Sequence, residues 1–267
     1  PYYDSYAACI ALAGAHRRVL QLRTPDWSFY ADALERAITP NTRVLLLNSP
    51  HNPTGKVFSV AELELIARVC VEHDLLAITD EVYEHLVFDG RHVPLMTLPG
   101  MRERSIRIGS AGKTFSLTGW KVGYVTAAPA LLDPITKAHQ FTTFTTPPNF
   151  QRAVAYGLAK DDTYYRDLAG ALAAKRDRFA AGLARLGFAV APCQGTYFVT
   201  ADATPLRLNV DDVELCHVMT VEAGVTAVPL SAFDDGKPPA TFVRFCFSKK
   251  DEVLDEALAR LGRWLGR

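Results

Sequence analysis

The stretch Ser110-Ala111-Gly112-Lys113-Thr114-Phe115-Ser116-Leu117-Thr118-Gly119-Trp120-Lys121-Val122-Gly123-Tyr124 decides how this chain is interpreted. It follows an apolar run, residues 105–109, that is typical of a strand, and it places two lysines among small and hydroxylated residues. A lysine that forms a covalent imine must be approachable and must lose its proton, and small neighbours and a nearby cation favour both. A second lysine beside hydroxyl groups suits a phosphate.

The ligand that these features predict carries both an aldehyde and a phosphate, and pyridoxal 5′-phosphate is such a ligand. The alternative interpretation of the same stretch is a solvated loop, rich in Lys, Ser and Thr, between two strands. Polar residues at the ends of other apolar runs favour the cofactor, because parallel sheets bind ligands beyond the carboxyl ends of their strands.

Composition sets the class of protein. The 267 residues are 49% hydrophobic and 22% charged, which is ordinary for a globular enzyme. Lys plus Arg and Asp plus Glu are 29 each, so we expect neither nucleic acid nor a membrane surface as a partner. The five cysteines form no CxxC pair, which indicates a reducing, cytoplasmic location. No apolar run is long enough to span a bilayer.

Alternating strand and helix patterns predict an α/β fold with a mostly parallel sheet and helices on both faces. We expect a large domain over residues 1–150, a connecting helical segment over 151–186 with a break at Asp161-Asp162, and a small α+β domain over 187–267. Val44-Leu45-Leu46-Leu47 indicates a strand buried on both faces. Ser59 and Glu62 form a capping box that opens a helix. Further strands are expected at 75–79, 104–109 and 122–127.

Two strand ends carry residues suited to the cofactor's ring. The strand ending at Asn48 leads into a stiff loop with two prolines and a glycine, which fixes Asn52 so that its amide can donate to a phenolate oxygen. The next strand is followed by Asp80, whose carboxylate can pair with a protonated pyridine nitrogen, and by Tyr83, whose hydroxyl can donate to the ring oxygen. The alternatives are a turn asparagine, a helix-capping aspartate and a packed aromatic side chain.

Arg244 lies in the middle of a predicted strand, Phe242-Val243-Arg244-Phe245-Cys246-Phe247. Strand alternation places it on one face with Phe242 and Cys246, so the guanidinium needs an anionic partner among apolar groups. Its planar fork matches the α-carboxylate of an amino acid. The alternative is a structural salt bridge to a nearby Asp or Glu. The histidines have no metal-ligand spacing, so we expect no metal site, and no dinucleotide-binding glycine fingerprint follows a strand.

At this point the sequence resembles one family, the class I/II aminotransferases of the pyridoxal-phosphate fold-type I group, over nearly its whole length. Three motifs carry the resemblance, in the family's order: Asn48-Ser49-Pro50-His51-Asn52-Pro53-Thr54-Gly55, Thr79-Asp80-Glu81-Val82-Tyr83, and Ser110-Ala111-Gly112-Lys113 followed by Gly119-Trp120-Lys121. Two further segments look most like kynurenine/glutamine and methionine aminotransferases: Gly119-Trp120-Lys121-Val122-Gly123-Tyr124 and His139-Gln140-Phe141-Thr142-Thr143-Phe144. Some N-succinyldiaminopimelate aminotransferases also look similar.

The resemblance implies a role for each candidate residue. Lys113 is expected to form the Schiff base with the cofactor and to move the proton of the substrate's α-carbon. The remaining roles are the pyridinium contact for Asp80, ring-oxygen contacts for Asn52 and Tyr83, ring stacking for Tyr3, phosphate contacts for Ser110 and Lys121, and the α-carboxylate contact for Arg244, with Asn52 also facing the substrate.

The expected reaction is transfer of an amino group between an α-amino acid, with an apolar, aromatic or kynurenine-, methionine- or glutamine-like side chain, and a 2-oxo acid. The resemblance also implies a homodimer. The family's chain begins upstream of Pro1, so we expect the large domain to be incomplete at its N-terminus. Three alternatives remain: a pyridoxal-phosphate-dependent cysteine-conjugate β-lyase, an N-succinyldiaminopimelate aminotransferase, and an inactive truncated binding partner.

Overall fold

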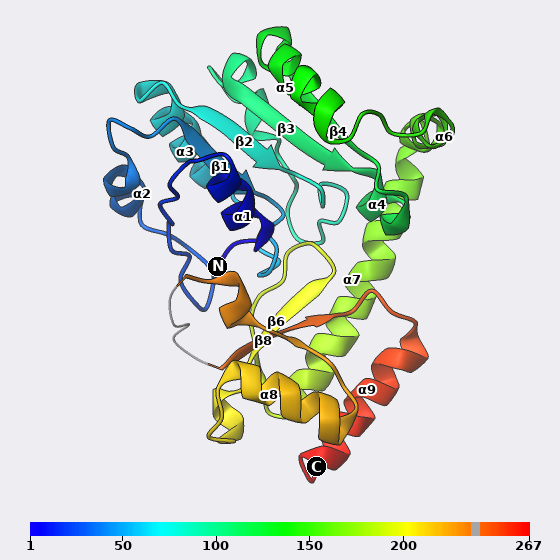
Figure 1. Ribbon diagram of the computed structural model, residues 1–267. Coiled ribbons are helices and arrows are strands. Elements are labelled where there is room, and N and C mark those ends of the chain that lie inside the picture. Colours follow the sequence, from blue (N-terminus) through cyan, green and yellow to red (C-terminus); the bar gives the residue numbers. More distant parts are fainter. Residues whose placement is uncertain (236–240) are drawn as a thin grey trace. The chain divides into compact units, whose positions relative to one another are not determined.

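The computed structural model describes residues 1–235 and 241–267, which group into two compact units (Figure 1). Unit 1 comprises residues 1–37, 51–56 and 170–267, and unit 2 comprises residues 38–50 and 57–169. The sequence-based division placed residues 1–37 and 51–56 in the large domain, whereas here they group with the C-terminal segment. The reason is specific backbone pairing within unit 1: Tyr2 N donates to Phe233 O at 2.7 Å, and Gln194 N donates to Gly55 O at 2.8 Å.

Unit 2 is built on a four-stranded sheet in the order β1-β2-β3-β4. The strands β1, β2 and β3 are parallel, and β4 is antiparallel to β3, so the prediction of a mostly parallel sheet is confirmed. The bounds are β1 Val44–Asn48, β2 Leu76–Asp80, β3 Ser105–Ser110 and β4 Gly123–Ala127.

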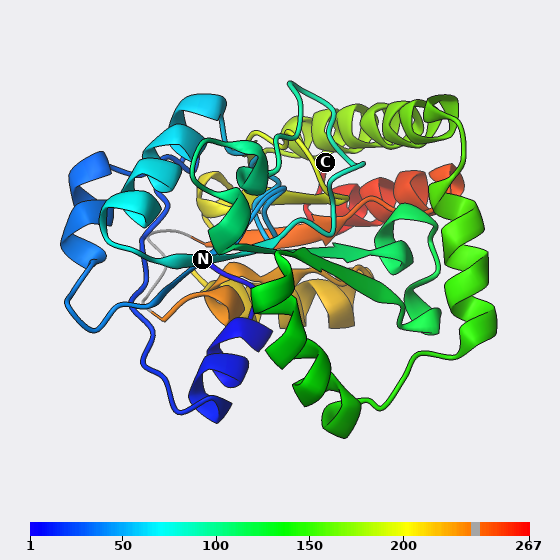
Figure 2. The same cartoon turned by 90° about the horizontal axis from the view of Figure 1, so that it is seen from above.

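The helix α3 (Val60–Glu72) begins where the sequence predicts. Ser59 N donates to the Glu62 carboxylate at 2.8 Å, and Glu62 N donates to Ser59 Oγ at 3.2 Å, which completes the capping box. In Figure 2, α3 and α5 (Pro129–Thr142) lie on opposite sides of the sheet of unit 2. The buried face of α3 consists of Leu63, Ile66, Ala67, Val69 and Cys70.

The predicted break in the long helical segment is present. The helix α6 (Pro148–Leu158) ends before Asp161, and α7 (Asp162–Arg185) begins after it. The Asp161 carboxylate accepts hydrogen bonds from Thr163 N and Thr163 Oγ1, both at 2.8 Å. Because this side chain satisfies a donor of the first turn, α7 has a defined start.

Unit 1 contains an antiparallel sheet in the order β5-β6-β8-β7. Its strands are β5 Ala189–Val190, β6 Phe198–Asp202, β7 Val228–Pro229 and β8 Phe242–Cys246. Its helices are α1 Ser5–Leu12, α2 Ala31–Ala37, α8 Asp212–Val218 and α9 Asp251–Trp264, together with the part of α7 from Gly170 onward. The α8 helix continues into a π-helical turn, Met219–Ala223, which ends at Gly224 with φ of 65°. The core includes edge-to-face ring contacts of Phe245 with Phe179 and Phe188, at centroid distances of 5.8 and 5.9 Å.

Candidate functional site

The predicted cofactor residues of unit 2 follow strand ends at one edge of its sheet. The register pairs Asn48 with Asp80 and Asp80 with Ile108, so β1, β2 and β3 end at the same edge. The antiparallel pairing of Ser110 with Gly123 brings the start of β4 to that edge as well. Lys121 lies two residues before Gly123. The fold therefore delivers Asp80, Ser110 and the lysine loop to one side of the sheet.

Lys113 lies in the short helix α4 (Ala111–Thr114), directly after β3. Close packing under the lysine explains the glycine beside it. A Cβ on Gly112 would lie 3.1 Å from Thr118 Cα and 3.3 Å from Ser110 Oγ. Lys113 is half-buried, and its Nζ lies 5.7 Å from the centroid of the Tyr83 ring. The structure thus brings two of the predicted residues, Lys113 and Tyr83, together within unit 2.

Asp80 and Tyr83 belong to one turn at the end of β2. Val82 N donates to Asp80 Oδ1 at 3.3 Å, and the backbone oxygen of Asp80 accepts from Asn48 Nδ2 at 2.8 Å. Glu84 N donates to Glu81 O at 2.9 Å, which closes this turn, and Leu86 N donates to Tyr83 O at 2.8 Å in the turn that follows. Tyr83 is buried, whereas Asp80 is partly exposed. The turn holds its carboxylate at a strand end, where ligands of such sheets bind.

Ser110 and Lys121 are polar residues whose side chains have capacity for a ligand. Ser110 occupies the capping position of α4 without using its hydroxyl as a cap, and that hydroxyl bonds to no described residue. Lys121 is exposed, takes a left-handed backbone conformation with φ of 55°, and forms no ion pair with residues 1–235 or 241–267. A hydroxyl and an ammonium group together suit a phosphate.

In unit 1, Arg244 lies between two aromatic rings. Its guanidinium carbon lies 4.0 Å from the Phe198 ring centroid and 4.6 Å from the Phe233 ring centroid. Its Nη1 donates to Asn52 Oδ1 at 2.5 Å. Because the amide oxygen of Asn52 accepts this bond, the donor role expected of Asn52 falls to its amide nitrogen. Arg244 and Asn52 are the second pair of predicted residues that the structure brings together.

The loop that carries Asn52 is buried and tightly packed. A Cβ on Gly55, whose φ is 76°, would lie 2.9 Å from Cys193 Sγ and 3.1 Å from Gly195 O. His51 hydrogen-bonds through Nδ1 to Thr54 Oγ1 at 2.7 Å. Burial, reinforced by the charge of Lys56, lowers the pKa of His51 to about 3, so the imidazole is neutral near pH 7.

Tyr3, the predicted stacking residue, is 39% exposed and belongs to unit 1. Its ring makes an edge-to-face contact with Tyr6, at a centroid distance of 5.5 Å. The neighbouring Tyr2 donates its hydroxyl hydrogen bond to Asp235 at 2.6 Å. The position of Tyr3 just before α1 leaves a large part of its ring accessible.

Sequence reasoning missed a polar network beside Asp80 that is centred on the buried Glu81 and includes the partly buried residues Glu84, His92, Arg107 and Tyr124. Arg107 lies in a predicted strand and Glu81 lies just after one, but their pairing depends on the register of β2 against β3. That register places Arg107 opposite Thr79, two residues before Glu81.

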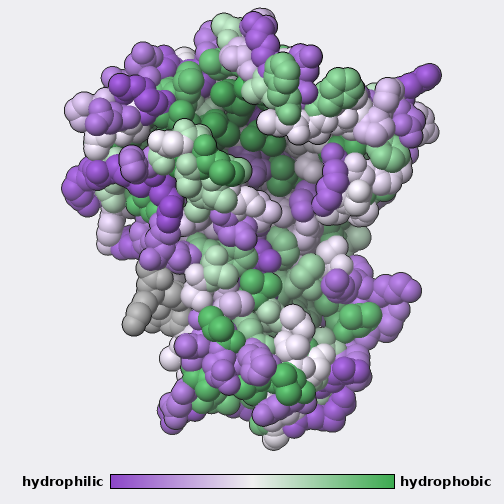
Figure 3. Space-filling model, in the orientation of Figure 1, coloured by the Kyte–Doolittle hydropathy of each residue, from purple (hydrophilic) through white to green (hydrophobic). Residues whose placement is uncertain are grey.

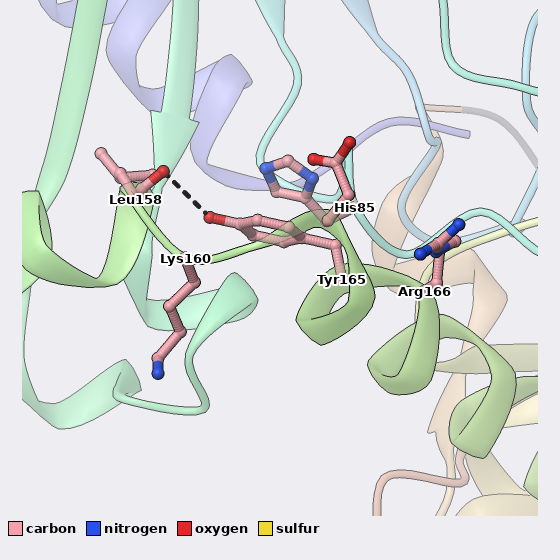
Figure 4. Close-up of a pocket in the computed structure, with 6 residues that line it drawn as sticks. His85, Leu158, Lys160, Tyr165 and Arg166 are labelled. Atoms are coloured by element: carbon pink, nitrogen blue, oxygen red, sulfur yellow. Dashed lines mark hydrogen bonds between the residues drawn. The ribbon is translucent and has the colours of Figure 1, made fainter.

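A surface hollow of about 460 Å³ lies elsewhere in unit 2, on the first turns of α7 (Figure 4). The His85 ring stacks on the Tyr165 ring there, with centroids 4.3 Å apart, and Tyr165 donates its hydroxyl hydrogen bond to Leu158 O at 3.3 Å. None of the predicted cofactor residues lines it. The lining residues are His85, Leu158, Lys160, Asp162, Tyr165 and Arg166.

The chemistry of the unit 2 residues fits pyridoxal phosphate. The cofactor requires a carboxylate for the ring nitrogen, an amine for the aldehyde, and a hydroxyl and an ammonium for the phosphate. Asp80, Lys113, Ser110 and Lys121 are residues of these types, and they lie at one sheet edge. Among residues 1–235 and 241–267, no group of three or more His, Cys, Asp or Glu side chains is arranged to hold a metal ion. No described helix has both the length and the apolar character to cross a membrane.

Comparison with known proteins gives the family context. Residues 1–261 match the family model described as aminotransferase class I and II. The chain is 47% identical, over 98% of its length, to a probable N-succinyldiaminopimelate aminotransferase of Mycobacterium tuberculosis, of which it covers 68%. The solved structure of the mycobacterial N-succinyldiaminopimelate aminotransferase matches 98% of the chain, with a TM-score of 0.95, and 69% of that structure is covered.

Two further relatives carry other names. The chain is 38% identical to kynurenine–oxoglutarate transaminase 3 of Mus musculus, covering 99% of this chain and 64% of that protein. It is 37% identical to methionine aminotransferase of Escherichia coli, covering 98% of this chain and 68% of that protein. The chain thus spans about two thirds of the length of these relatives.

Proposed function

Because the chain belongs to the class I and II aminotransferases, fold-type I enzymes that use pyridoxal phosphate to move an amino group from an α-amino acid to a 2-oxo acid, we propose that Lys113, Asp80 and Arg244 carry the central roles of that reaction here. The observation that carries the proposal is the placement of Lys113, Asp80, Ser110 and Lys121 at one edge of the unit 2 sheet.

The cofactor residues divide into three tasks. When bound, pyridoxal phosphate supplies an aldehyde for amines and a ring that accepts the electron pair released at the substrate's α-carbon. Lys113 Nζ would be the amine that holds the aldehyde, and the freed amine would accept the proton of the substrate's α-carbon. The Asp80 carboxylate keeps the ring nitrogen protonated, while Tyr83 and the Asn52 amide nitrogen donate to the ring oxygen. Ser110 and Lys121 bind the phosphate, and Tyr3 stacks on the ring.

Arg244 binds the α-carboxylate of the amino acid. Its guanidinium plane is set by the Phe198 and Phe233 rings, and its Nη1 is held by Asn52. A guanidinium fixed in this way presents its remaining donors in one orientation, which suits a bidentate carboxylate. Because every α-amino acid has this carboxylate, Arg244 does not distinguish between amino donors.

For the amino donor we favour an apolar, aromatic or kynurenine-, methionine- or glutamine-like amino acid. Relatives named for kynurenine with oxoglutarate and for methionine, at 38 and 37% identity, support this class. N-succinyldiaminopimelate is a second candidate, favoured by the relative named for it at 47% identity. A panel of these donors with 2-oxoglutarate as acceptor separates the two.

We also infer a cytoplasmic homodimer. Helix α5 has no fully buried residue, and Phe141 at its C-terminal end is 86% exposed, followed by Phe144 at 75%. Figure 3 shows hydrophobic residues among hydrophilic ones around this part of unit 2. Exposed aromatic side chains of this kind are typical of an interface, and a second copy would cover them. All five cysteines are free thiols, which supports a reducing compartment.

The test is a titration of the purified protein with pyridoxal phosphate, followed by borohydride reduction and peptide mapping. We expect a visible absorbance band and a label on Lys113, and then transamination of members of the donor panel. A label on another lysine would contradict the site assignment. Release of pyruvate and ammonia from a cysteine conjugate, without a 2-oxo acid, would instead identify a β-lyase. Absence of cofactor binding would indicate an inactive binding partner.

A further inference from the structure

The buried residue Glu81 is the centre of a charge network in unit 2. It is 2% exposed, and its Oε2 accepts from Arg107 Nε at 2.7 Å and faces His92 Nε2 at 2.8 Å. Burial by itself would raise the pKa of Glu81, but the hydrogen bonds and charges of His92 and Arg107 outweigh it, and the pKa lies below its usual value. Glu81 is therefore an ionised carboxylate inside the protein, directly after Asp80.

Arg107 connects this carboxylate to a second one. Its Nη2 forms an ion pair with Glu84 Oε2, and Tyr124 donates its hydroxyl hydrogen bond to Glu84 Oε1 at 2.9 Å. Glu84 N also donates to Glu81 O at 2.9 Å. The turn that contains Tyr83 is thus held from β3 through Arg107 and from β4 through Tyr124.

Gly109 is the residue that lets Tyr124 reach Glu84. The two are register partners on β3 and β4. A Cβ added at Gly109 would lie 2.1 Å from Tyr124 Cε2 and 2.4 Å from Tyr124 Cζ, which no structure tolerates without movement. The Tyr124 ring therefore occupies the space that any side chain at position 109 would need, so this position requires glycine.

The strand residues of the network and the candidate cofactor residues lie on opposite faces of the sheet. Residues paired across neighbouring strands share a face, and alternate residues along a strand return to it. Arg107 pairs with Thr79 and with Thr126, so Arg107 and Tyr124 share one face of the sheet. Asp80 and Ser110 are each one residue further along their strands than Thr79 and Gly109, so they belong to the opposite face. The charges anchor one face of the strand ends, while the opposite face presents the candidate cofactor residues.

Building on the proposed function, we propose that Glu81, Glu84, Arg107 and Tyr124 form a positioning network, with His92 as a further partner of Glu81, that sets the orientation of Asp80 and Tyr83 toward pyridoxal phosphate. The alternative is that these charges only stabilise the fold. Buried ion pairs contribute little net stability compared with apolar packing. Here Glu81 directly follows Asp80 and Glu84 directly follows Tyr83, so a shift of either carboxylate would move the adjacent cofactor residue.

Three variants of the protein separate positioning from stability: Tyr124→Phe, Glu81→Gln and Gly109→Ala. For each, the dissociation constant of pyridoxal phosphate, the absorbance spectrum of the bound cofactor and the melting temperature of the cofactor-free protein are measured. We expect affinity to fall about tenfold for Glu81→Gln and Gly109→Ala, with a changed spectrum. A displaced Asp80 would weaken its hydrogen bond to the charged ring nitrogen, and loss of such a bond has about this size. Tyr124→Phe removes only a hydroxyl, so its affinity for pyridoxal phosphate should lie between that of these two variants and that of the unmodified protein.

The Gly109 clash gives an internal check. In a Tyr124→Ala background the ring is gone, so Gly109→Ala should cause no further loss of affinity. As a matched control, Arg104→Gln removes hydrogen bonds from Arg104 to Gly100 O at 3.0 Å and to Leu75 O at 3.1 Å, just before β3, and it should lower the melting temperature without changing cofactor affinity. Should Glu81→Gln fail to fold, Tyr124→Phe and the double variant still decide the question.

The outcomes distinguish this inference from the function on which it rests. If network variants lower the melting temperature but leave affinity and spectrum unchanged, the network is structural and the inference is wrong. Asp80→Asn provides the reference. If Asp80→Asn weakens binding while the network variants do not, only the inference fails, and if Asp80→Asn also has no effect, the proposed role of Asp80 fails with it.

Discussion

Arg244 Nη1 donates a hydrogen bond to Asn52 Oδ1 at 2.5 Å, although 192 positions separate the two residues in the chain. The bond connects the middle of β8 with the buried loop at residues 51–56, and both belong to unit 1. Rings of Phe198 and Phe233 hold the guanidinium on its faces, so three contacts define its orientation. Two side chains proposed to face the substrate are thus mutually dependent.

Replacing Arg244 with lysine should therefore affect substrate binding more than cofactor binding. Lysine keeps the charge but loses the planar fork, so we expect KM for the amino donor to rise about 10-fold to 100-fold. The dissociation constant of pyridoxal phosphate should remain within about twofold of its original value. Arg178→Lys, at an exposed ion pair with Asp255 in the same unit, is the control and should change neither quantity. An equal loss of cofactor affinity in Arg244→Lys would contradict the assignment.

Lys113→Ala should leave the fold intact and remove transamination. The side chain belongs to a helix of only four residues and is only half-buried, so the circular dichroism spectrum should be unchanged. We expect the rate to fall by about 100-fold to 10,000-fold or more, as for loss of a proton-transferring group. Lys250→Ala, which removes an exposed lysine of unit 1, serves as control. Turnover that survives in Lys113→Ala would refute the proposed role.

The burial of His51 predicts a pH dependence of stability. Its pKa is about 3 in the folded protein and about 6.5 when exposed, so the unfolded state binds the proton more readily. The contribution of His51 is fully present above pH 6.5 and is lost as the pH falls toward 3. The slope approaches about 1.4 kcal/mol per pH unit inside this window. Urea unfolding at pH 6.5, 5.5 and 4.5 should show a smaller acid loss for His51→Gln than for the original protein, and identical losses would disprove the burial effect.

The capping box of α3 gives a prediction about stability alone. Ser59→Ala removes the side chain that accepts from Glu62 N, and it should lower the free energy of unfolding by about 1 kcal/mol. Ser59→Asp keeps an acceptor at the same position and should restore most of the loss. Cofactor affinity should be the same in all three proteins, measured alongside denaturant unfolding. A change in cofactor affinity would contradict the prediction that the cap of α3 affects stability alone.

If the protein is a dimer as proposed, removal of the exposed aromatic side chains near the end of α5 should weaken its association. Phe141→Ser combined with Phe144→Ser should shift the protein toward monomer by light scattering after size exclusion, because the change removes apolar area from the proposed interface. Val221→Ser, at an exposed apolar position of unit 1, is the control and should leave the mass unchanged. A monomer already present before substitution would exclude the homodimer for this chain.

Elements with strong local signals could be predicted from the sequence. The apolar run at 44–47 forms β1, the Ser59 and Glu62 pair caps α3, and the aspartates at 161–162 separate α6 from α7. In contrast, α1 was not predicted. Its sequence, SYAACIAL, is apolar on all sides and has no fully buried residue, so it lacks the periodicity by which helices are recognised.

The candidate site was predictable to the extent that it follows strand ends. Asp80 and Lys113 stand directly after apolar runs, and their types match a known chemistry. The bond between Arg244 and Asn52 could not be predicted, because it depends on folding across distant segments. The pairing of Glu81 with Arg107 could not be predicted either, because it is set by strand register. A slip of one residue in the register would move the side chains to the other face of the sheet.

The chain passes from one unit to the other after Ala37, Pro50, Lys56 and Ala169. A ribosome releases the first 37 residues long before the strands β6 and β8 of the same unit exist, whereas all of unit 2 has been synthesised by Ala169. Strands β1 to β4 of unit 2 can therefore pair before residues 170–267 are made, and residues 1–37 must wait for those residues. A nascent chain stalled near its end should accordingly protect β1 to β4 from protease while residues 1–37 are still cleaved.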